Sequence, residues 1–172
     1  MQNGRRDPGF LRDDVTKLEV DVHADLLCTV RFHKPTLGFQ GKFSIDYVLA
    51  AMLLDGRVDL DSFTDEYCSS ARMRAALDKV QVNAHPEWAH DRESRRNSPV
   101  TITMKDGRRL AKSVSKVHGS PGNPLTRDEL VAKYRVCASR VLQGQRLEKS
   151  IAVLENLDQL PAAKELIDAV TI

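Results

Sequence analysis

The chain has 172 residues, of which 41% are hydrophobic and 29% charged, and its formal net charge is +2. That length suits one domain, or one domain with a helical extension, and the apolar share is enough for a hydrophobic core. Near-balanced charge and an aromatic share of only 5% disfavour a nucleic-acid-binding protein. We therefore expect a globular protein with no nucleic-acid partner.

The cysteines and the apolar segments indicate a cellular location. Cys28, Cys68 and Cys137 are odd in number and show neither CxxC spacing nor the pattern of a secreted disulfide framework. No apolar run is long enough to cross a membrane, and the basic N-terminal residues lack the apolar core of a signal peptide. We expect reduced thiols, a cytoplasmic location and no membrane partner.

The first third of the chain predicts an arm, a strand and a long loop. Residues 1–13 are polar and contain glycine and proline, which favours a flexible arm. Apolar and polar residues alternate from Leu18 to Val22, the period of a half-buried strand. From Ala24 to Gln40 the alternation is lost, and a connecting loop is expected.

Helices follow that loop. Ser44 is a good N-cap and Gly56 a good C-terminal stop, so Ile45–Asp55 is predicted to be helical and largely buried. Three shorter elements are then predicted: helices over residues 61–67 and 70–79, and a short strand from Val80.

The second half predicts a hairpin and then helices. Apolar residues alternate from Val100 to Met104 before an Asp106-Gly107 turn, which predicts a β-hairpin. Thr126 and Glu129 form a capping box at the start of a helix that should run to about Leu142 and stop at Gly144. Two more helices are predicted: one with apolar positions from Leu147 to Leu157, and one that begins at Pro161.

These elements predict an α+β fold with a small antiparallel sheet, packing helices and C-terminal helices. We expect a flexible arm over residues 1–13, an α+β domain over 14–125 and a helical region over 126–172.

The most suggestive chemistry lies before the predicted helix at Ile45. Lys42 lies at the entrance of that helix, where free backbone N–H groups favour an anion. Arg31, His33 and Lys34 form a basic cluster in the preceding loop, and long loops frequently carry binding residues. The pattern favours an anion-binding loop, although a solvated charged loop beside an ordinary helix cap is the commoner outcome.

Other candidate sites receive weaker support. His85 and His90 are metal-ligand types, but they lie five residues apart in a segment with no helical period, so no metal site is expected. His118 precedes a glycine-proline loop and is a minor acid–base candidate. Cys68 has no neighbouring histidine to activate it as a nucleophile. The sequence contains no P-loop, dinucleotide fingerprint or GxSxG motif.

Three segments, in order, carry a family resemblance: GKFSIDYVLAAMLLDGRVDLDSFTDE, VTITMKDGRRL and HGSPGNPLTRDELVAKY. Together they resemble the C-terminal part of the MmgE/PrpD family, from about Asp14 to Leu157. The resemblance implies an α+β lid domain that closes over a cleft, with final helices that pack on a large helical domain. It also implies homo-oligomers that need neither a metal nor an organic cofactor.

Members of this family are lyases and related enzymes that act on small polycarboxylates. They include 2-methylcitrate dehydratase, cis-aconitate decarboxylase and an iminodisuccinate epimerase. The resemblance implies a polycarboxylate substrate and chemistry similar to that of 2-methylcitrate dehydratase.

The resemblance also limits which residues can be assigned. The helical domain, which supplies most of the family's acid–base residues, has no counterpart in this sequence, so we assign no catalytic residue. Lys42 matches the basic position before the helix, and with His33, Lys34 and Arg31 it is predicted to bind substrate. The decarboxylases place a tyrosine near Phe32, and its hydroxyl is absent here.

Two interpretations follow. In the first, the chain is the lid of a polycarboxylate lyase, inactive without a helical domain encoded separately. In the second, it is a truncated relic that acts at most as a small interaction or dimerisation domain.

Overall fold

The computed structural model describes residues 11–88, 98–114 and 116–171. It divides into two compact units, which we name the sheet unit (residues 2–117) and the C-terminal unit (residues 118–172). Most of the predicted N-terminal arm lies outside the described residues. The arm's last three residues lie in and just before a 3₁₀ turn, Arg12–Asp14.

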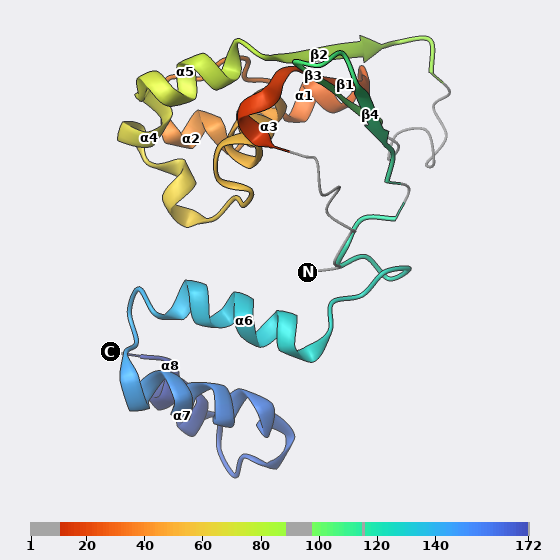
Figure 1. Ribbon diagram of the computed structural model, residues 1–172. Helices are drawn as coiled ribbons and strands as arrows, with labels where there is room; N and C mark the ends of the chain where they lie inside the picture. Colours follow the sequence, from red (N-terminus) through yellow and green to blue (C-terminus); the bar gives the residue numbers. More distant parts are fainter. Residues whose placement is uncertain (1–10, 89–97, 115, 172) are drawn as a thin grey trace. The chain divides into compact units, whose positions relative to one another are not determined.

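The sheet unit contains a four-stranded sheet in the order β2-β1-β3-β4 (Figure 1). Its strands are β1 (Val15–His23), β2 (Val80–His85), β3 (Val100–Met104) and β4 (Arg109–Lys112). The β1–β3 and β3–β4 pairs are antiparallel, but β1 and β2 run parallel. The α+β class is confirmed, while the expectation of a wholly antiparallel sheet is corrected. The reason is the long helical crossover between β1 and β2, which a parallel pair requires.

Strand β1 has the buried face that its sequence predicts. Val15, Leu18, Val20 and Val22 are all buried. Val15 and Leu18 are three residues apart, so a regular strand would place them on opposite faces. The pairing with β3 shifts its register between Val15 and Lys17. Val15 packs in a small cluster with Leu53 and Met104, whereas Leu18 belongs to the main cluster.

The crossover from β1 to β2 holds six short helical elements. They are α1 (Leu26–Thr29), α2 (Gly38–Gly41), α3 (Ile45–Asp55), η2 (Leu60–Phe63), α4 (Asp65–Ser69) and α5 (Ala71–Leu77). The predicted loop thus contains two single-turn helices. The helix expected over residues 61–67 is broken at Thr64, whose extended backbone and side-chain oxygen cap α4 instead.

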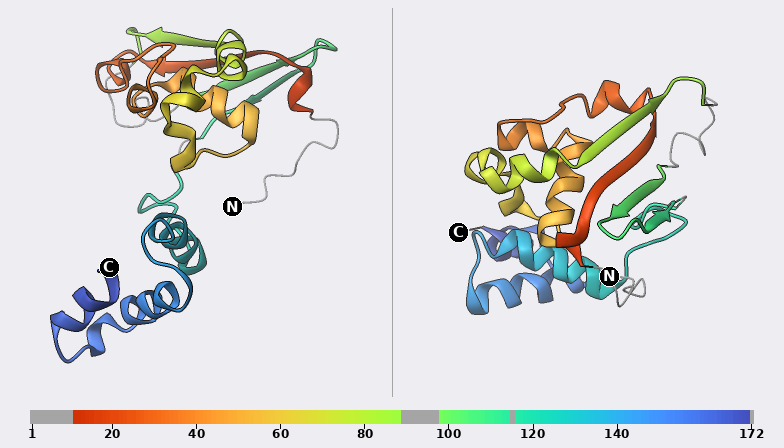
Figure 2. Two further views of the ribbon diagram at one scale, coloured as in Figure 1. Left: turned by 90° about the vertical axis from the view of Figure 1, so that its left-hand side faces the viewer. Right: turned by 45° about the horizontal axis from the view of Figure 1, so that its top comes forward.

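Helix α3 has the predicted bounds and is the centre of the core. The Ser44 hydroxyl accepts a hydrogen bond from the Tyr47 N–H, and Gly56 ends the helix in a left-handed conformation. Tyr47 is fully buried in the main hydrophobic cluster. Helix α3 packs against α5 and β2 (Figure 2). The buried cluster joins the sheet to α3 and α5: Leu18, Tyr47, Ala50, Ala51, Cys68, Met73, Ala76, Leu77 and Val80.

The C-terminal unit consists of α6 (Arg127–Ala138), α7 (Gly144–Glu155), the 3₁₀ turn η4 (Leu157–Gln159) and α8 (Ala163–Val170). The capping box at Thr126 and Glu129 is confirmed. Helix α6 ends at Ala138, earlier than predicted, and Gly144 is the first residue of α7 rather than the stop of α6. Among the described residues, no helix has the length and apolar character needed to cross a membrane.

Candidate functional site

A pocket of about 300 Å³ lies in the sheet unit where the loop after α1 meets the start of α3. We name it the loop pocket. Its lining is mostly apolar, with three groups that can carry charge. The lining residues are Leu27, Val30, Arg31, Phe32, His33, Ile45, Asp46 and Val82.

Local backbone pairing brings the loop to the helix entrance. Arg31 and Ser44 form an isolated antiparallel bridge. The Phe32 N–H donates to the Phe43 carbonyl at 3.1 Å. These bonds hold the loop alongside the residues that cap α3, so Arg31 and His33 reach the same pocket although they precede α3 by more than ten residues.

Asp46 is the charged residue at the base of this arrangement, and its side chain is only 1% exposed. Its Oδ1 accepts hydrogen bonds from the Ser44 hydroxyl and from the Tyr47 N–H, the latter at 2.8 Å. Its Oδ2 accepts from the Lys34 N–H at 2.8 Å and lies 2.6 Å from His33 Nδ1. A buried carboxylate is tolerated when donors surround it in this way.

Arg31 and His33 are the groups that a ligand can reach. The His33 side chain is 68% exposed, although its Nδ1 is engaged by Asp46. The Arg31 guanidinium lies 5.4 Å from the centre of the Phe32 ring, within the range of a cation–π contact. The pocket therefore presents a guanidinium and an imidazole beside apolar walls, a combination suited to an anionic ligand.

The other two predicted binding residues are not part of the pocket lining. Lys34 contributes its N–H to Asp46, but its Nζ lies 2.6 Å from Asp78 Oδ1. Lys42 is the residue that follows α2, and it is exposed. The structure thus gathers Arg31 and His33 in one pocket and leaves the amino groups of Lys34 and Lys42 outside it.

Sequence reasoning missed Asp46 as a member of the site. An acidic residue in a first helical turn normally signals only a favourable interaction with the helix dipole. The available signal was its position directly after the Ser44 cap, facing a loop that carries three basic residues. Burial and the shared contacts with Lys34 and His33 become visible only in the folded chain.

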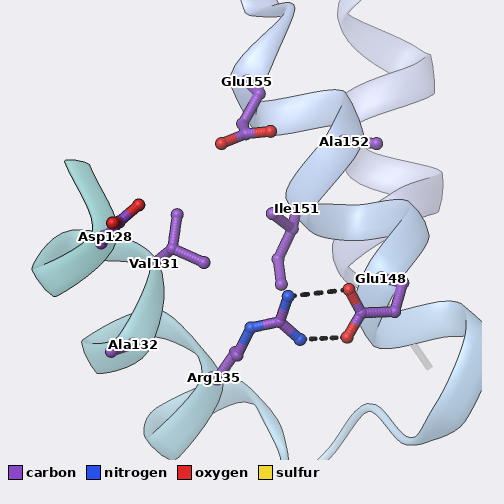
Figure 3. A pocket seen from close by; sticks show the side chains of 8 residues that line it. All are labelled: Asp128, Val131, Ala132, Arg135, Glu148, Ile151, Ala152 and Glu155. Atoms are coloured by element: carbon purple, nitrogen blue, oxygen red, sulfur yellow. Dashed lines mark hydrogen bonds and ion pairs between the residues drawn. The ribbon is translucent and has the colours of Figure 1, made fainter.

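The C-terminal unit has a second pocket, of about 450 Å³, between α6 and α7 (Figure 3). The Arg135 guanidinium makes a two-pronged ion pair with Glu148 across it, with Nη2 and Oε2 2.8 Å apart. Its remaining lining includes Val131, Ile151 and Ala152. Because Glu148 already neutralises the Arg135 guanidinium, this pocket is less suited to binding an anion than the loop pocket is.

The remaining candidates are engaged in local structure. His85 is paired with Asp21 and Glu87, and His90 lies outside the described residues. Within the residues that the structure covers, no group of three metal-ligating side chains is found. The Cys68 thiol donates to the Pro35 carbonyl at 3.4 Å, and burial raises its pKa, which disfavours the reactive thiolate.

Comparison with known proteins identifies relatives of this chain. Residues 2–159 match the family model of the MmgE/PrpD C-terminal domain. The chain is 28% identical over 134 residues to the cis-aconitate decarboxylase of Homo sapiens, covering 73% of this chain and 26% of that protein. It is 29% identical over 126 residues to that of Mus musculus, covering 73% and 26%.

A third relative is the cis-aconitate decarboxylase of Aspergillus terreus, 25% identical over 137 residues, covering 78% of this chain and 28% of that protein. The chain thus spans about a quarter of the length of the curated relatives it matches. The predicted family resemblance is confirmed. Because the family model covers most of the sequence, this chain belongs to the MmgE/PrpD family, of which it contains the C-terminal domain.

Proposed function

We propose that this domain is the lid of a polycarboxylate lyase and that the loop pocket binds a carboxylate group of the substrate. The observation that carries the proposal is the joint placement of Arg31 and His33 on one apolar-walled pocket, anchored by the buried Asp46. A guanidinium binds a carboxylate with two parallel hydrogen bonds, and a protonated imidazole adds a third donor. The curated relatives are named for their action on cis-aconitate, a compound with several carboxylates.

A lid contributes to such a reaction by holding the substrate rather than by moving its protons. Closure over a cleft excludes water and strengthens each contact with a carboxylate. The acid or base that acts on the carbon skeleton would then come from the family's helical domain. On this proposal the chain binds substrate weakly alone and turns it over only with that domain.

Phe32 favours a dehydratase over a decarboxylase within this proposal. It lines the loop pocket and offers no hydroxyl to protonate a carbanion. The positioning of carboxylates by Arg31 and His33 serves elimination of water equally well. A substrate similar to 2-methylcitrate is therefore preferred.

The proposal also covers the cellular location, the oligomeric state and the partner domain. We expect a cytoplasmic homo-oligomer in which the C-terminal unit packs on a family helical domain. Several apolar side chains on this unit are exposed, which supports the expectation that a partner covers them. They are Leu130, Val136, Val141, Leu157, Ile167 and Val170.

The first test measures binding of cis-aconitate and citrate to the full chain by NMR titration or calorimetry. Arg31→Ala should weaken binding by about tenfold, the value of one lost charge-assisted interaction. Arg57→Ala is the matched control, because Arg57 is exposed, pairs with Asp59 and lies outside the pocket. Equal affinities in the two variants would remove the loop pocket from the proposal.

The second test is a substitution of Lys42. Because Lys42 does not line the loop pocket, Lys42→Ala should leave binding to the isolated chain unchanged. In an enzyme reconstituted with a helical domain, the same change should raise KM if Lys42 meets the substrate across the closed cleft. Unaltered kinetics there would remove Lys42 from the site.

The alternative function is an interaction domain without catalysis, and the same exposed apolar side chains favour it. Copurification from the native host separates the two functions. A helical partner of the same family supports the lyase. A self-associated chain without that partner and without lyase activity supports the interaction domain.

A further inference from the structure

We infer that Asp46 is a positioning residue that holds His33 with Nδ1 protonated, so that Nε2 faces the pocket and donates to a ligand carboxylate when the ring carries its second proton. The inference rests on the proposed function of the loop pocket and assigns roles to two of its residues. Asp46 touches no ligand in this arrangement, and it acts through His33.

The Asp46 carboxylate is buried, and both of its oxygens face donors. Ser44 and Tyr47, at the start of α3, supply the donors to Oδ1, whereas Lys34 and His33 of the loop face Oδ2. One carboxylate therefore joins the loop to the helix. A hydrophobic or neutral residue could not satisfy both sets of donors at once.

The contact with Asp46 fixes which nitrogen of His33 carries a proton. An ionised carboxylate only accepts hydrogen bonds, and its Oδ2 lies 2.6 Å from Nδ1. Two lone pairs cannot face each other at that distance without repulsion, so Nδ1 carries a proton. Any second proton, the one that makes the ring cationic, then sits on Nε2.

His33 Nε2 is accessible to a ligand. The His33 side chain is 68% exposed and lines the pocket, and among the described residues no protein group is seen to pair with Nε2. When Nε2 carries the second proton, it can donate to a ligand carboxylate, which completes a row of Asp46, imidazolium and ligand. Arg31 lines the same pocket and can bind a second oxygen.

The backbone supports this placement. Lys34 has a φ of 43°, a left-handed conformation that is uncommon outside glycine. Its N–H donates to the same Oδ2 that faces His33. Arg74 stabilises this turn, because its guanidinium donates to the carbonyls of Lys34 and Pro35. Strain of this kind persists where the surroundings fix the geometry, and here it sets the imidazole against the carboxylate.

The first experiment reads the tautomer directly. Long-range ¹H–¹⁵N correlation spectra of the ¹⁵N-labelled full chain, without ligand, should show the neutral His33 ring protonated on Nδ1, whereas free histidine favours Nε2. Asp46→Asn should move His33 toward the Nε2 form. The control is Asp78→Asn, which removes one exposed carboxylate that pairs with Lys34 and should leave the His33 signals in place. A wild-type ring protonated on Nε2 alone overturns the inference, even if Asp46→Asn fails to fold.

The second experiment is a double-mutant cycle on the binding of citrate and cis-aconitate. His33→Ala and Asp46→Asn should each weaken binding by about tenfold, and the double variant should be no weaker than His33→Ala alone. Additive losses would mean that Asp46 acts on the fold and not through His33. Thermal melts of all variants identify losses that come from unfolding.

Different results would overturn the role of Asp46 and the proposed function of the loop pocket. If the wild type binds citrate and Arg31→Ala weakens it, but Asp46→Asn binds with unchanged affinity, only the role of Asp46 is overturned. If the wild type binds neither compound at millimolar concentration, the proposed function falls and this inference falls with it.

Discussion

Gly38, the first residue of α2, shows how tightly the loop is packed against the rest of the sheet unit. A Cβ at this position would lie 2.0 Å from the Phe63 carbonyl oxygen and 2.5 Å from its carbon. Both are backbone atoms, which cannot rotate away as a side chain can. The Gly38 N–H also donates to Asp65 Oδ1 at 2.7 Å. The course of the loop therefore depends on the absence of a side chain here.

Gly38→Ala should lower the free energy of unfolding by about 3 kcal/mol, the upper part of the usual range for overpacking. Gly107→Ala is the control, because a Cβ there meets no atom within 4 Å, although φ is +84°. That change should cost only about 1 kcal/mol, from the left-handed backbone. Urea unfolding of both variants gives the comparison, and equal losses would show that the contact with Phe63 is relieved by movement.

At the scale of elements, the paired strands β1 and β2 carry a charged cluster on their exposed surface. His85 Nε2 lies 2.9 Å from Asp21 Oδ1, and its Nδ1 lies 2.6 Å from Glu87 Oε1. The ring also stacks on Trp88, with centroids 4.5 Å apart. Hydrogen bonds with Asp21 and then Glu87 raise the pKa of His85, and the hydrogen bond with His85 lowers the pKa of Asp21.

This cluster predicts a pH-dependent stability. His85 stabilises the folded chain fully below its unfolded pKa, about 6.5, and the contribution is lost as pH rises through the raised folded pKa. The contribution of Asp21 is present above its unfolded pKa and is lost as pH falls through the lowered one. The difference in Tm between wild type and His85→Gln should therefore be largest near pH 5–6 and shrink above neutrality.

The matched control for that series is Gln81→Ala, on the same strand, which removes no titratable group. Its effect on Tm should be the same at every pH. A His85→Gln difference that is equally constant would mean that the ring contributes through its stacking on Trp88 and not through its charge.

Local signals predicted the elements well. The Ser44 cap, the Asp106-Gly107 turn and the capping box at Thr126 each act within a few residues, so the sequence displays them directly. The parallel pairing of β1 with β2 depends on contacts between residues some sixty positions apart, such as Leu18 and Val80. That pairing has no local pattern. The break at Thr64 does have one, because the Thr64 side chain caps α4 within three residues, but this cap competes with the helical spacing on which the prediction relied.

The candidate site was predictable only in part, for the same reason. A basic loop before a capped helix pointed to Arg31 and His33, and both lie on one pocket. Lys34 belongs to the same basic cluster, but its amino group pairs with Asp78. Lys42 was predicted at the helix entrance, but it follows α2 and does not line the pocket. The importance of Asp46 follows from burial, which composition and spacing do not reveal.

At the scale of the whole chain, the two units differ in how much apolar surface they bury. The sheet unit has a continuous cluster that joins the sheet to α3 and α5. Among the described residues of the C-terminal unit, the buried apolar ones are Leu142, Ile151 and Ala169, and six large apolar side chains named above are exposed. A unit with so little buried surface gains little free energy from its own packing.

This difference predicts how fragments behave. Residues 11–117 should fold alone and unfold cooperatively, because the main cluster lies entirely within them. Residues 118–172 should show partial helicity and a broad, non-cooperative thermal transition, since short helices need tertiary packing. Circular dichroism melts of the two fragments test this.

A sharp transition in the isolated C-terminal fragment would contradict the expectation. It would mean that α6, α7 and α8 bury enough of one another's apolar surface to fold without a partner. That result would weaken the proposed docking on a helical domain. If the fragment is instead loosely ordered, addition of a family helical domain to the full chain should slow hydrogen exchange in α6, α7 and α8. Exchange in α3, which is already buried in the sheet unit, should change little.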